Sequence, residues 1–515
     1  MNVRRSSGGA PRIHLLGGRD GVRMEGDGEV RLGHPLSGDH LDSGPPADGV
    51  FAGWSWDGER LVVRNDRYGI CPVYYRSGNN SLAVSPDPLA LLPLDRSAEP
   101  DHDAMAVFVR LGFFLGEDTC FGGIRALPPA ATLVMDARGM RLRSRGPAAV
   151  EPTAMTGTRA VDGLIEFFRE SVARRLPDEP YEFPLSGGRD SRHILLELCR
   201  RGIPPRRCVS GSKFPPDPGA DAQVAGVLAD RLGLAHTVIP RPRSQFRADL
   251  VALPAQGLGT LEGAWALPVL DHLGRHSRVS YDGVGGEQAQ HPNVGFIREN
   301  PYDRADLPGL AERLLSAGRT GPHVDRLLGP RLGALWSRDR ARRRLVTELA
   351  RHAHSASPLT SFFFWNRTRR AVAPTPFTLG DPRLLTHTPY LDHDLFDHLA
   401  AVPHRILVDG TLHDRALHKA FPRYAGIGFA SSTPQLRGPV LVAHRLAYLL
   451  RLLGHTLRRK NWRHSPNRLP QRLLAAGRGP GAAQRVSRLQ PLALHLLLLE
   501  ELLTPGSGRG PGRTP

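Results

Sequence analysis

The sequence predicts two kinds of domain in one chain, a β-rich antiparallel sandwich followed by an α/β domain with a parallel sheet and a helical end. The length of 515 residues exceeds one ordinary hydrophobic core and favours two domains. Short apolar runs fill residues 1–150, whereas strand and helix patterns alternate further along the chain. Because 40% of the residues are hydrophobic and 23% are charged, the composition is that of a folded protein.

The first 150 residues contain short apolar runs that are bounded by turn-forming residues. Examples are 60–63, 72–75 and 132–135, and Gly, Asp and Asn separate them. Such close spacing of strands predicts an antiparallel sheet or sandwich rather than a parallel one.

The pattern then changes to strand, loop and helix, which we assign to a domain over residues 155–430. An amphipathic helix is predicted from about Ala160 to Leu176. Strands are predicted at Tyr181–Leu185, Arg207–Ser210, His236–Ile239 and Val279–Asp282, with helices at Ser191–Arg201 and Asp221–Leu232. This alternation implies a parallel sheet whose carboxyl edge carries ligand-binding loops.

Beyond about Pro301 the chain is predicted to be mainly helical to Leu503, with loops around 355–358 and 478–481. Residues 431–503 form a basic helical extension, and 504–515, rich in Gly, Pro and Ser, are predicted to be a disordered tail. The mostly apolar run 492–499 is predicted to be a packing helix.

The formal charge of +18 is concentrated at the carboxyl end. Residues 431–515 hold fourteen Lys and Arg against two acids, a net charge of +12. A solvated helical face is one interpretation, and a docking surface for an acidic peptide, carrier or membrane surface is the other. Because aromatic residues are sparse in this region, no nucleic-acid partner is expected.

The cysteines and the apolar runs exclude several classes of protein. Four cysteines without CxxC spacing indicate neither a disulfide framework nor a zinc site. The amino end lacks a signal-peptide core, and no apolar run is long enough to span a bilayer. We therefore expect a cytoplasmic protein without a transmembrane segment.

One loop carries the chemistry, Leu185-Ser186-Gly187-Gly188-Arg189-Asp190-Ser191. Its two glycines let the backbone approach an anion, and the following helix supplies unpaired N–H groups, which together make a phosphate cradle. The lysine of the Walker A loop is absent, so the expected chemistry differs from cleavage between the β- and γ-phosphates. Asp190 can hold Mg²⁺, and Ser186 and Ser191 can donate to phosphate oxygens. A Gly-Gly turn without a ligand is the alternative interpretation.

Five further segments support a family resemblance. They are Asp66–Tyr75, Gly123–Pro129, Gly219–His236, Asp282–Gln288 and Pro389–Asp392. With the SGGxDS loop, they resemble asparagine synthetase and its relatives over roughly residues 50–430. The resemblance implies an α+β glutaminase-like sandwich of the Ntn type, then an α/β ATP pyrophosphatase domain (adenine nucleotide alpha hydrolase-like) with a helical carboxyl-terminal part.

The resemblance also implies an activity, an ATP-dependent formation of an amide bond with AMP and pyrophosphate as products. ATP and Mg²⁺ are the expected cofactors, and a carboxylate, with a precursor peptide as one candidate, is the expected substrate. Asp190 and Glu287 are the implied catalytic and metal-binding residues. The implied ATP-binding residues are Leu185, Ser186, Gly187, Gly188, Asp190, Ser191, Ser210, Asp282 and Gly283.

The glutaminase part departs from the family pattern. Asn2 stands where glutamine-hydrolysing members have a nucleophilic cysteine. We therefore predict that residues 1–150 are a degenerate class II glutamine amidotransferase-like domain, with a misannotated start as the alternative. Relatives without this cysteine include β-lactam synthetases and lasso-peptide macrolactam cyclases, which use an amine of their own substrate.

The synthetase part departs from the pattern as well. Glu287 and Gln288 stand where aspartate and glutamate are usual, and Arg189 replaces an aliphatic residue, facing either phosphate or solvent. The family's lysine that stabilises negative charge aligns with Asp414, for which Arg415 or Lys419 are candidate substitutes.

Three functions are therefore predicted as alternatives. The first is an amide-forming ligase acting on a peptide or small acid in specialised biosynthesis. The second is an asparagine synthetase that converts aspartate to asparagine with ammonia. The third is a non-catalytic homologue that acts as a binding scaffold.

Overall fold

The structure is a computed structural model that describes residues 10–18, 21–41, 44, 47–92, 99–146, 154–215, 217, 219–289, 293–430, 438–457, 472 and 482–503. The prediction of a disordered tail at 504–515 and of a loop at 478–481 therefore lies outside the described residues.

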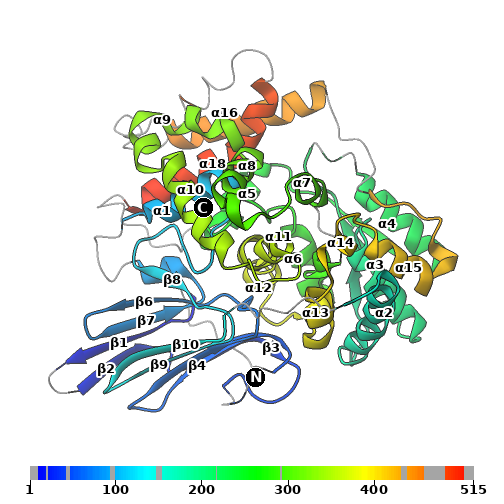
Figure 1. Ribbon diagram of the computed structural model, residues 1–515, viewed down its shortest axis with the longest axis horizontal. Helices are drawn as coiled ribbons and strands as arrows, with labels where there is room; N and C mark the ends of the chain where they lie inside the picture. The colour runs from blue at the N-terminus through cyan, green and yellow to red at the C-terminus, as the bar shows by residue number, and fades with distance from the viewer. Residues whose placement is uncertain are drawn as a thin grey trace.

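Two five-stranded antiparallel sheets form the sandwich, as the sequence predicted (Figure 1). One sheet has the order β2-β1-β7-β6-β8 and the other β10-β9-β5-β4-β3. In strand β5 every second residue is buried, which is the pattern of a strand with one face on a core. The strands are β1 (Ile13–Gly18), β2 (Gly21–Gly26), β3 (Glu29–Pro35), β4 (Gly49–Trp56), β5 (Leu61–Asn65), β6 (Tyr74–Gly78), β7 (Ser81–Ser85), β8 (Ile124–Ala126), β9 (Ala131–Asp136) and β10 (Gly139–Ser144).

The turn after β5 is organised by one buried carboxylate. Asp66 is fully buried and accepts hydrogen bonds from the backbone N–H groups of Tyr68, Ile70 and Cys71. Burial raises the pKa of Asp66 to about 6, while these backbone hydrogen bonds lower it. The carboxylate thus replaces the hydrogen bonds that a tight turn cannot make within the backbone.

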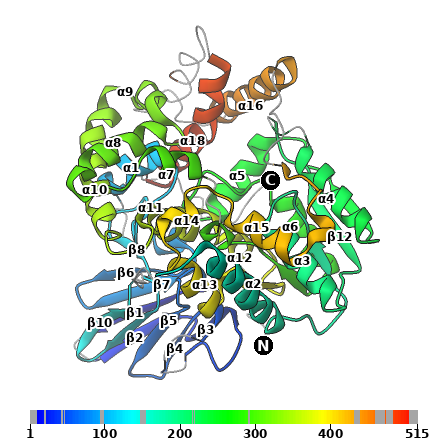
Figure 2. The ribbon, with the colours of Figure 1, turned by 45° about the vertical axis from the view of Figure 1, so that its right-hand side comes forward.

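A helix inside the first 150 residues was not predicted from the sequence. Helix α1 (His102–Leu111) begins at Asp101, whose side chain accepts from the N–H groups of Asp103 and Ala104, and ends at Gly112. Nearly every residue of α1 is buried, because it packs against α8 (Leu307–Ala317) and α10 (Arg338–Ala350) rather than on the sandwich (Figure 2). Its residues 104–109 form a continuous apolar run, which periodicity alone does not distinguish from a buried strand.

The second part is built on a three-stranded parallel sheet of order β11-β12-β13, as predicted. Its strands are β11 (Glu182–Pro184), β12 (Arg207–Gly211) and β13 (His236–Ile239). The fourth predicted strand is real, but the prediction of one continuous sheet was wrong. Strand β14 (Val279–Tyr281) lies beside β11 and is hydrogen-bonded to β15 (Leu385–His387), a strand that the sequence reasoning missed. At three residues, β15 is too short for a periodic signal.

Helices cover this sheet and the space between it and the sandwich (Figure 1). Predicted helices at 160–176, 191–201 and 221–232 correspond to α2, α3 and α4. The helices from α2 to α7 are α2 (Gly157–Ala173), α3 (Asp190–Arg200), α4 (Ala220–Arg231), α5 (Gln245–Ala255), α6 (Leu267–His276) and α7 (Val294–Glu299). The later helices are α8 (Leu307–Ala317), α9 (Val324–Leu335), α10 (Arg338–Ala350), α11 (Pro358–Phe363), α12 (Thr375–Leu379), α13 (His393–Ala400), α14 (His404–Leu407) and α15 (Leu412–Ala420). The short 3-10 helices are η1 (Pro88–Leu91), η2 (Gly286–Gln288), η3 (Arg304–Asp306), η4 (Gly321–His323), η6 (Pro389–Leu391) and η7 (Pro422–Tyr424).

A π-helix, η5 (Phe364–Val372), joins the two parts of the molecule. Its buried Arg369 and Arg370 donate hydrogen bonds to the backbone carbonyls of Leu127 and Asp118 in the first part. Phe364 and Trp365 pack in the same hydrophobic core as the sandwich strands. The sandwich therefore shares its core with residues of the second part of the chain.

Two helices of the carboxyl-terminal extension are described, α16 (Pro439–Leu457) and α18 (Ala482–Leu503). The apolar run 492–499 is buried in the helical core, which confirms the prediction that it packs. Within the described residues, no helix combines the length and hydropathy that a membrane span requires.

Candidate functional site

The predicted loop leaves β11 at the carboxyl edge of the parallel sheet and enters α3. Ser186 Oγ lies 2.8 Å from Ser191 Oγ, and the Gly188 N–H donates to Ser186 Oγ at 3.2 Å. A Cβ at Gly187 would lie 2.7 Å from Ala430 Cβ, so the chain that closes over the loop leaves room only for glycine there. The two serines therefore hold the shape of the loop.

A second loop packs directly on Asp190. A Cβ at Gly283 would lie 2.5 Å from Asp190 Cβ, and a Cβ at Gly286 would collide with the Asp190 carboxylate. Because both positions are glycine, the segment 282–287 can approach Asp190 so closely. The structure thus brings together two motifs that lie about ninety residues apart in the sequence.

Three carboxylates gather where these loops meet. Burial and the negative charges of Glu287 and Asp282 together raise the pKa of Asp190 to about 8, while the Arg189 guanidinium lowers it. The Asp190 side chain is 42% exposed, so solvent reaches one side of it. Burial also raises the pKa values of Asp282 and Glu287. Such repulsion is relieved when a cation binds among the carboxylates.

Glu287 has an unused ligand atom. Its Oε2 accepts a hydrogen bond from the Gly285 N–H at 3.0 Å, whereas its Oε1 is buried and has no hydrogen-bond partner in the described part of the chain. A hydrogen bond with the Thr368 side chain also lowers the pKa of Glu287. A buried carboxylate oxygen without a partner, on the segment that packs against Asp190, fits Mg²⁺, which takes oxygen ligands. Among the described residues no group of three or more His, Cys, Asp or Glu could hold a metal alone. Mg²⁺ here would share its shell with phosphate oxygens, as is usual for this ion.

A buried network that the sequence reasoning missed lies behind Asp190. His413 Nδ1 lies 3.4 Å from Asp190 Oδ1, and Tyr390 Oη lies 3.0 Å from His413 Nε2 and 3.3 Å from His193 Nδ1. Burial lowers the pKa of His413 to about 3 and that of His193 well below its ordinary value, so both rings are neutral at pH 7. No sequence pattern indicates that these side chains from α3, η6 and α15 meet, because only the tertiary fold brings them together.

The structure decides the open question about Arg189. Its guanidinium pairs with Asp414, with Nη2 donating to Oδ2 at 3.0 Å, and it stacks 3.9 Å from the centre of the Phe429 ring. Arg189 and Asp414, two of the departures from the asparagine synthetase pattern, thus contact each other. The two candidate substitutes lie elsewhere, since Lys419 pairs with Asp162 and the Arg415 guanidinium lies beside Gly157 at the start of α2.

Several residues predicted to bind ATP have internal partners. The Ser210 hydroxyl donates to the Leu185 carbonyl at 2.6 Å and is only 2% exposed. Leu185 is also buried, and its N–H donates to the Val209 carbonyl. Asp282 accepts from the Val284 N–H at 2.8 Å. The structure places Ser210 and Leu185 beneath the loop, so a direct role for either in contacting phosphate stays a prediction.

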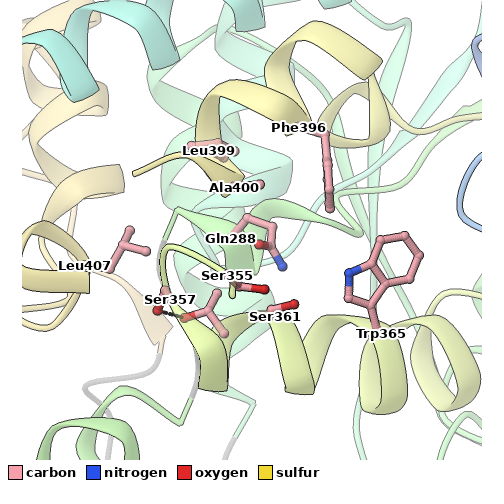
Figure 3. A pocket seen from close by; sticks show the side chains of 10 residues that line it. Gln288, Ser355, Ser357, Ser361, Trp365, Phe396, Leu399, Ala400 and Leu407 are labelled. Atoms are coloured by element: carbon pink, nitrogen blue, oxygen red, sulfur yellow. Dashed lines mark hydrogen bonds between the residues drawn. The ribbon is translucent and has the colours of Figure 1, made fainter. Parts of the chain in front are cut away.

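A small recess adjoins the second loop (Figure 3). Gln288 enters it from η2. Three serines of the segment 355–361 and Trp365 line one side, and Phe396 of α13 lines the other. Gln288 is 4% exposed, and its Nε2 has no hydrogen-bond partner within the described ranges. The lining carries no charged side chain, and η2 presents Gly286 to Asp190 and Gln288 to the recess.

None of the four cysteines is placed as a nucleophile. Cys71, Cys120 and Cys208 are buried and Cys199 is half-buried. Burial raises the pKa of Cys199 to about 11 and that of Cys208 to about 12, and it raises the pKa values of Cys71 and Cys120 further. All four remain thiols at neutral pH, which is the unreactive form.

A comparison with protein-family models matches part of the chain to the glutamine amidotransferase domain. Residues 21–145 form a glutamine amidotransferase-type domain. The match contains strands β2 to β10 and helix α1 and ends before α2 begins. No curated protein matches the chain.

Two solved structures show a weak likeness. One is described as the structure of the allosteric regulatory enzyme of purine biosynthesis, with 10% identity and a TM-score of 0.14, over 39% of this chain and 50% of that one. The other is the glutamine phosphoribosylpyrophosphate amidotransferase from B. subtilis complexed with ADP and GMP, also at 10% identity and a TM-score of 0.14, over 38% and 48%. The likeness spans about half the length of each of these chains.

Proposed function

We propose that this chain is an ATP-dependent, AMP-forming ligase of the asparagine synthetase type that joins a carboxylate to an amine. One observation carries the proposal, the meeting of Asp190 with the Gly283 and Gly286 backbone and the unpartnered Glu287 Oε1. A glycine loop at the carboxyl edge of a parallel sheet, opposite carboxylates that repel one another, suits a magnesium nucleotide.

The residues have distinct roles in this reaction. The loop from Ser186 to Asp190 binds the phosphate chain, and Asp190 and Glu287 hold Mg²⁺, which when bound neutralises charge on the phosphates. A substrate carboxylate oxygen attacks the α-phosphorus, the bond to the β-phosphate breaks, and pyrophosphate leaves. An amine nitrogen then attacks the acyl carbon, loses a proton and displaces AMP.

The source of the amine follows from the cysteines. Because all four thiols are buried or half-buried and stay protonated, none is placed to release ammonia from glutamine. We propose that the amine comes from the substrate itself, with free ammonia as the alternative that would make the protein an asparagine synthetase.

The test follows pyrophosphate release by purified protein with ATP, Mg²⁺ and a panel of carboxylic acids that includes aspartate and precursor peptides. We expect release that depends on the acid, and its loss in Asp190→Ala. The matched control is Asp162→Ala, because Asp162 pairs with Lys419 on the surface away from the loop. If no acid supports release and ATP does not bind, the ligase is excluded and a binding scaffold is the better assignment.

A further inference from the structure

Lys213 is a cation at the mouth of the loop that the proposed mechanism has not yet used. It follows β12, at the same edge of the sheet from which the loop leaves β11. Its Nζ lies 3.3 Å from Asp221 Oδ2 and 5.4 Å from the centre of the Trp265 ring. The side chain is 34% exposed, so it can reach a ligand that approaches from solvent.

The composition sets Lys213 apart. The chain has 68 Lys and Arg, of which only Lys213, Lys419 and Lys460 are lysine, so 65 are arginine. Lys460 lies outside the described residues, and Lys419 pairs with Asp162 on the surface. Arginine is the basic residue at almost every other position, but a lysine stands beside the loop. Its compact ammonium group differs in geometry from a planar guanidinium.

Asp221 occupies an anion position in the loop. Its Oδ1 accepts the Gly187 N–H at 3.1 Å, which is the type of donor that a phosphate oxygen uses in a glycine loop. Its other oxygen is the partner of Lys213. One carboxylate is therefore held by a loop N–H and an ammonium together, and the same two groups would hold a phosphate oxygen.

The other basic residues that could bind phosphate have different partners. Arg189 is bound to Asp414 and stacked on Phe429, and Arg192 donates to the carbonyls of Ile427 and Gly428. Arg415 and Lys419 lie along α2. Lys213 has one carboxylate partner, and that carboxylate already lies on the loop.

We propose that Lys213 binds the phosphate chain of ATP. It supplies the positive charge that an acid at position 414 does not supply. Without nucleotide, the Asp221 carboxylate accepts the hydrogen bond from the Gly187 N–H. When ATP binds, a phosphate oxygen replaces the carboxylate as the acceptor. This inference rests on the proposed function, since it concerns the same nucleotide.

The test measures binding of MgATP, AMP and adenosine to the full chain by calorimetry. Lys213→Met is expected to weaken ATP binding about tenfold or more, the loss for one charge-assisted hydrogen bond, and to leave adenosine binding unchanged. Lys213→Arg keeps the charge and is expected to recover part of the affinity. Asp221→Ala removes the competing carboxylate and is expected to tighten ATP binding, while Lys419→Met serves as the control.

The outcomes separate this inference from the proposed function. If Asp190→Ala abolishes pyrophosphate release but Lys213→Met binds ATP as the unmodified chain does, the role of Lys213 is wrong and the ligase stands. Equal loss of ATP and adenosine binding in Lys213→Met would show a structural role and also overturn it. Weaker ATP binding in Asp221→Ala overturns the displacement by phosphate. A chain that binds no ATP at all overturns both proposals.

Discussion

The sandwich and the parallel-sheet domain differ in where their polar groups face. In the sandwich, the carboxylate of Asp66 and the thiols of Cys71 and Cys120 are buried, and Asp66 serves the turn that contains it. In the parallel-sheet domain, Asp190 is 42% exposed at the edge of the sheet and meets other carboxylates. The first arrangement stabilises a fold, and the second suits binding of a charged ligand.

This difference shows that family likeness and chemistry can reside in different parts of one chain. The glutamine amidotransferase match lies in the part whose thiols are buried. The loop that fits a nucleotide lies outside that match, at residues 185–191. A function argued from the matched domain alone would leave this loop out, although the site and not the fold determines the reaction.

The largest effect is expected where the two parts meet. Arg175 is 1% exposed, and it bonds Asp392 at 2.8 Å in the second part and Asp48 at 2.8 Å in the first. Arg175→Ala is expected to lower the free energy of unfolding by about 3–5 kcal/mol, because it leaves Asp48 without its arginine partner and the buried Asp392 with Arg174 alone. Urea denaturation measures this loss, with Arg275→Ala as the control, since Arg275 is 69% exposed and pairs with Asp271 on the surface. Equal losses in both variants would mean that the two parts do not depend on this contact.

The next effect separates catalysis from stability. Gly286→Ala places a methyl group against the Asp190 carboxylate, so we expect pyrophosphate release to fall about a hundredfold as that carboxylate moves. Gly295→Ala is the control, because a Cβ there meets nothing within 4 Å. Unchanged release in Gly286→Ala would remove Asp190 from the mechanism.

A smaller effect is expected for the pair that differs from the family. In a double-mutant cycle of Arg189→Leu and Asp414→Asn, we expect a coupling of about 1 kcal/mol in the free energy of unfolding, since both side chains are partly exposed. Expressed as a free energy, the change in the rate of pyrophosphate release should be smaller than the change in the free energy of unfolding, because the pair supports the loop from outside. A hundredfold loss of release in either single variant would instead place the pair in contact with substrate.

The smallest effect concerns pH. The pKa of Asp190 is raised to about 8, so between about pH 4 and pH 8 the folded chain keeps a proton that the unfolded chain has lost. Stability from this group therefore falls as pH rises through that window, and Asp190→Asn, which cannot ionise, avoids the loss. The advantage of the variant over the unmodified chain in free energy of unfolding should grow from pH 5 to pH 8, by no more than about 1 kcal/mol because the Asp190 side chain is 42% exposed. The melting temperatures of the two proteins at each pH measure this difference. A constant difference would contradict the raised pKa.

Local sequence patterns predicted much of the fold, whereas contacts between residues distant in the sequence determined the remaining elements. The strand at 236–239 and the helices after each parallel strand follow from periodicity and turns, and the structure has them. Strand β15 has three residues and pairs with β14 across a hundred residues, and α1 contains a continuous apolar run that fits a strand as well as a helix, so the sequence reasoning missed both. At the site, the loop and the 282–287 segment were predicted, whereas Lys213 and His413 were missed because their neighbours come from other elements.

The shared core beneath η5 has a consequence for the history of the chain. Phe364, Trp365 and Leu391 fill the sandwich core from the other side of the molecule, and Arg369 binds a carbonyl of the first part. Deleting the sandwich would expose these rings to water, so the remainder would aggregate instead of surviving as a smaller enzyme. Selection for stability alone would therefore keep the first part joined to the second.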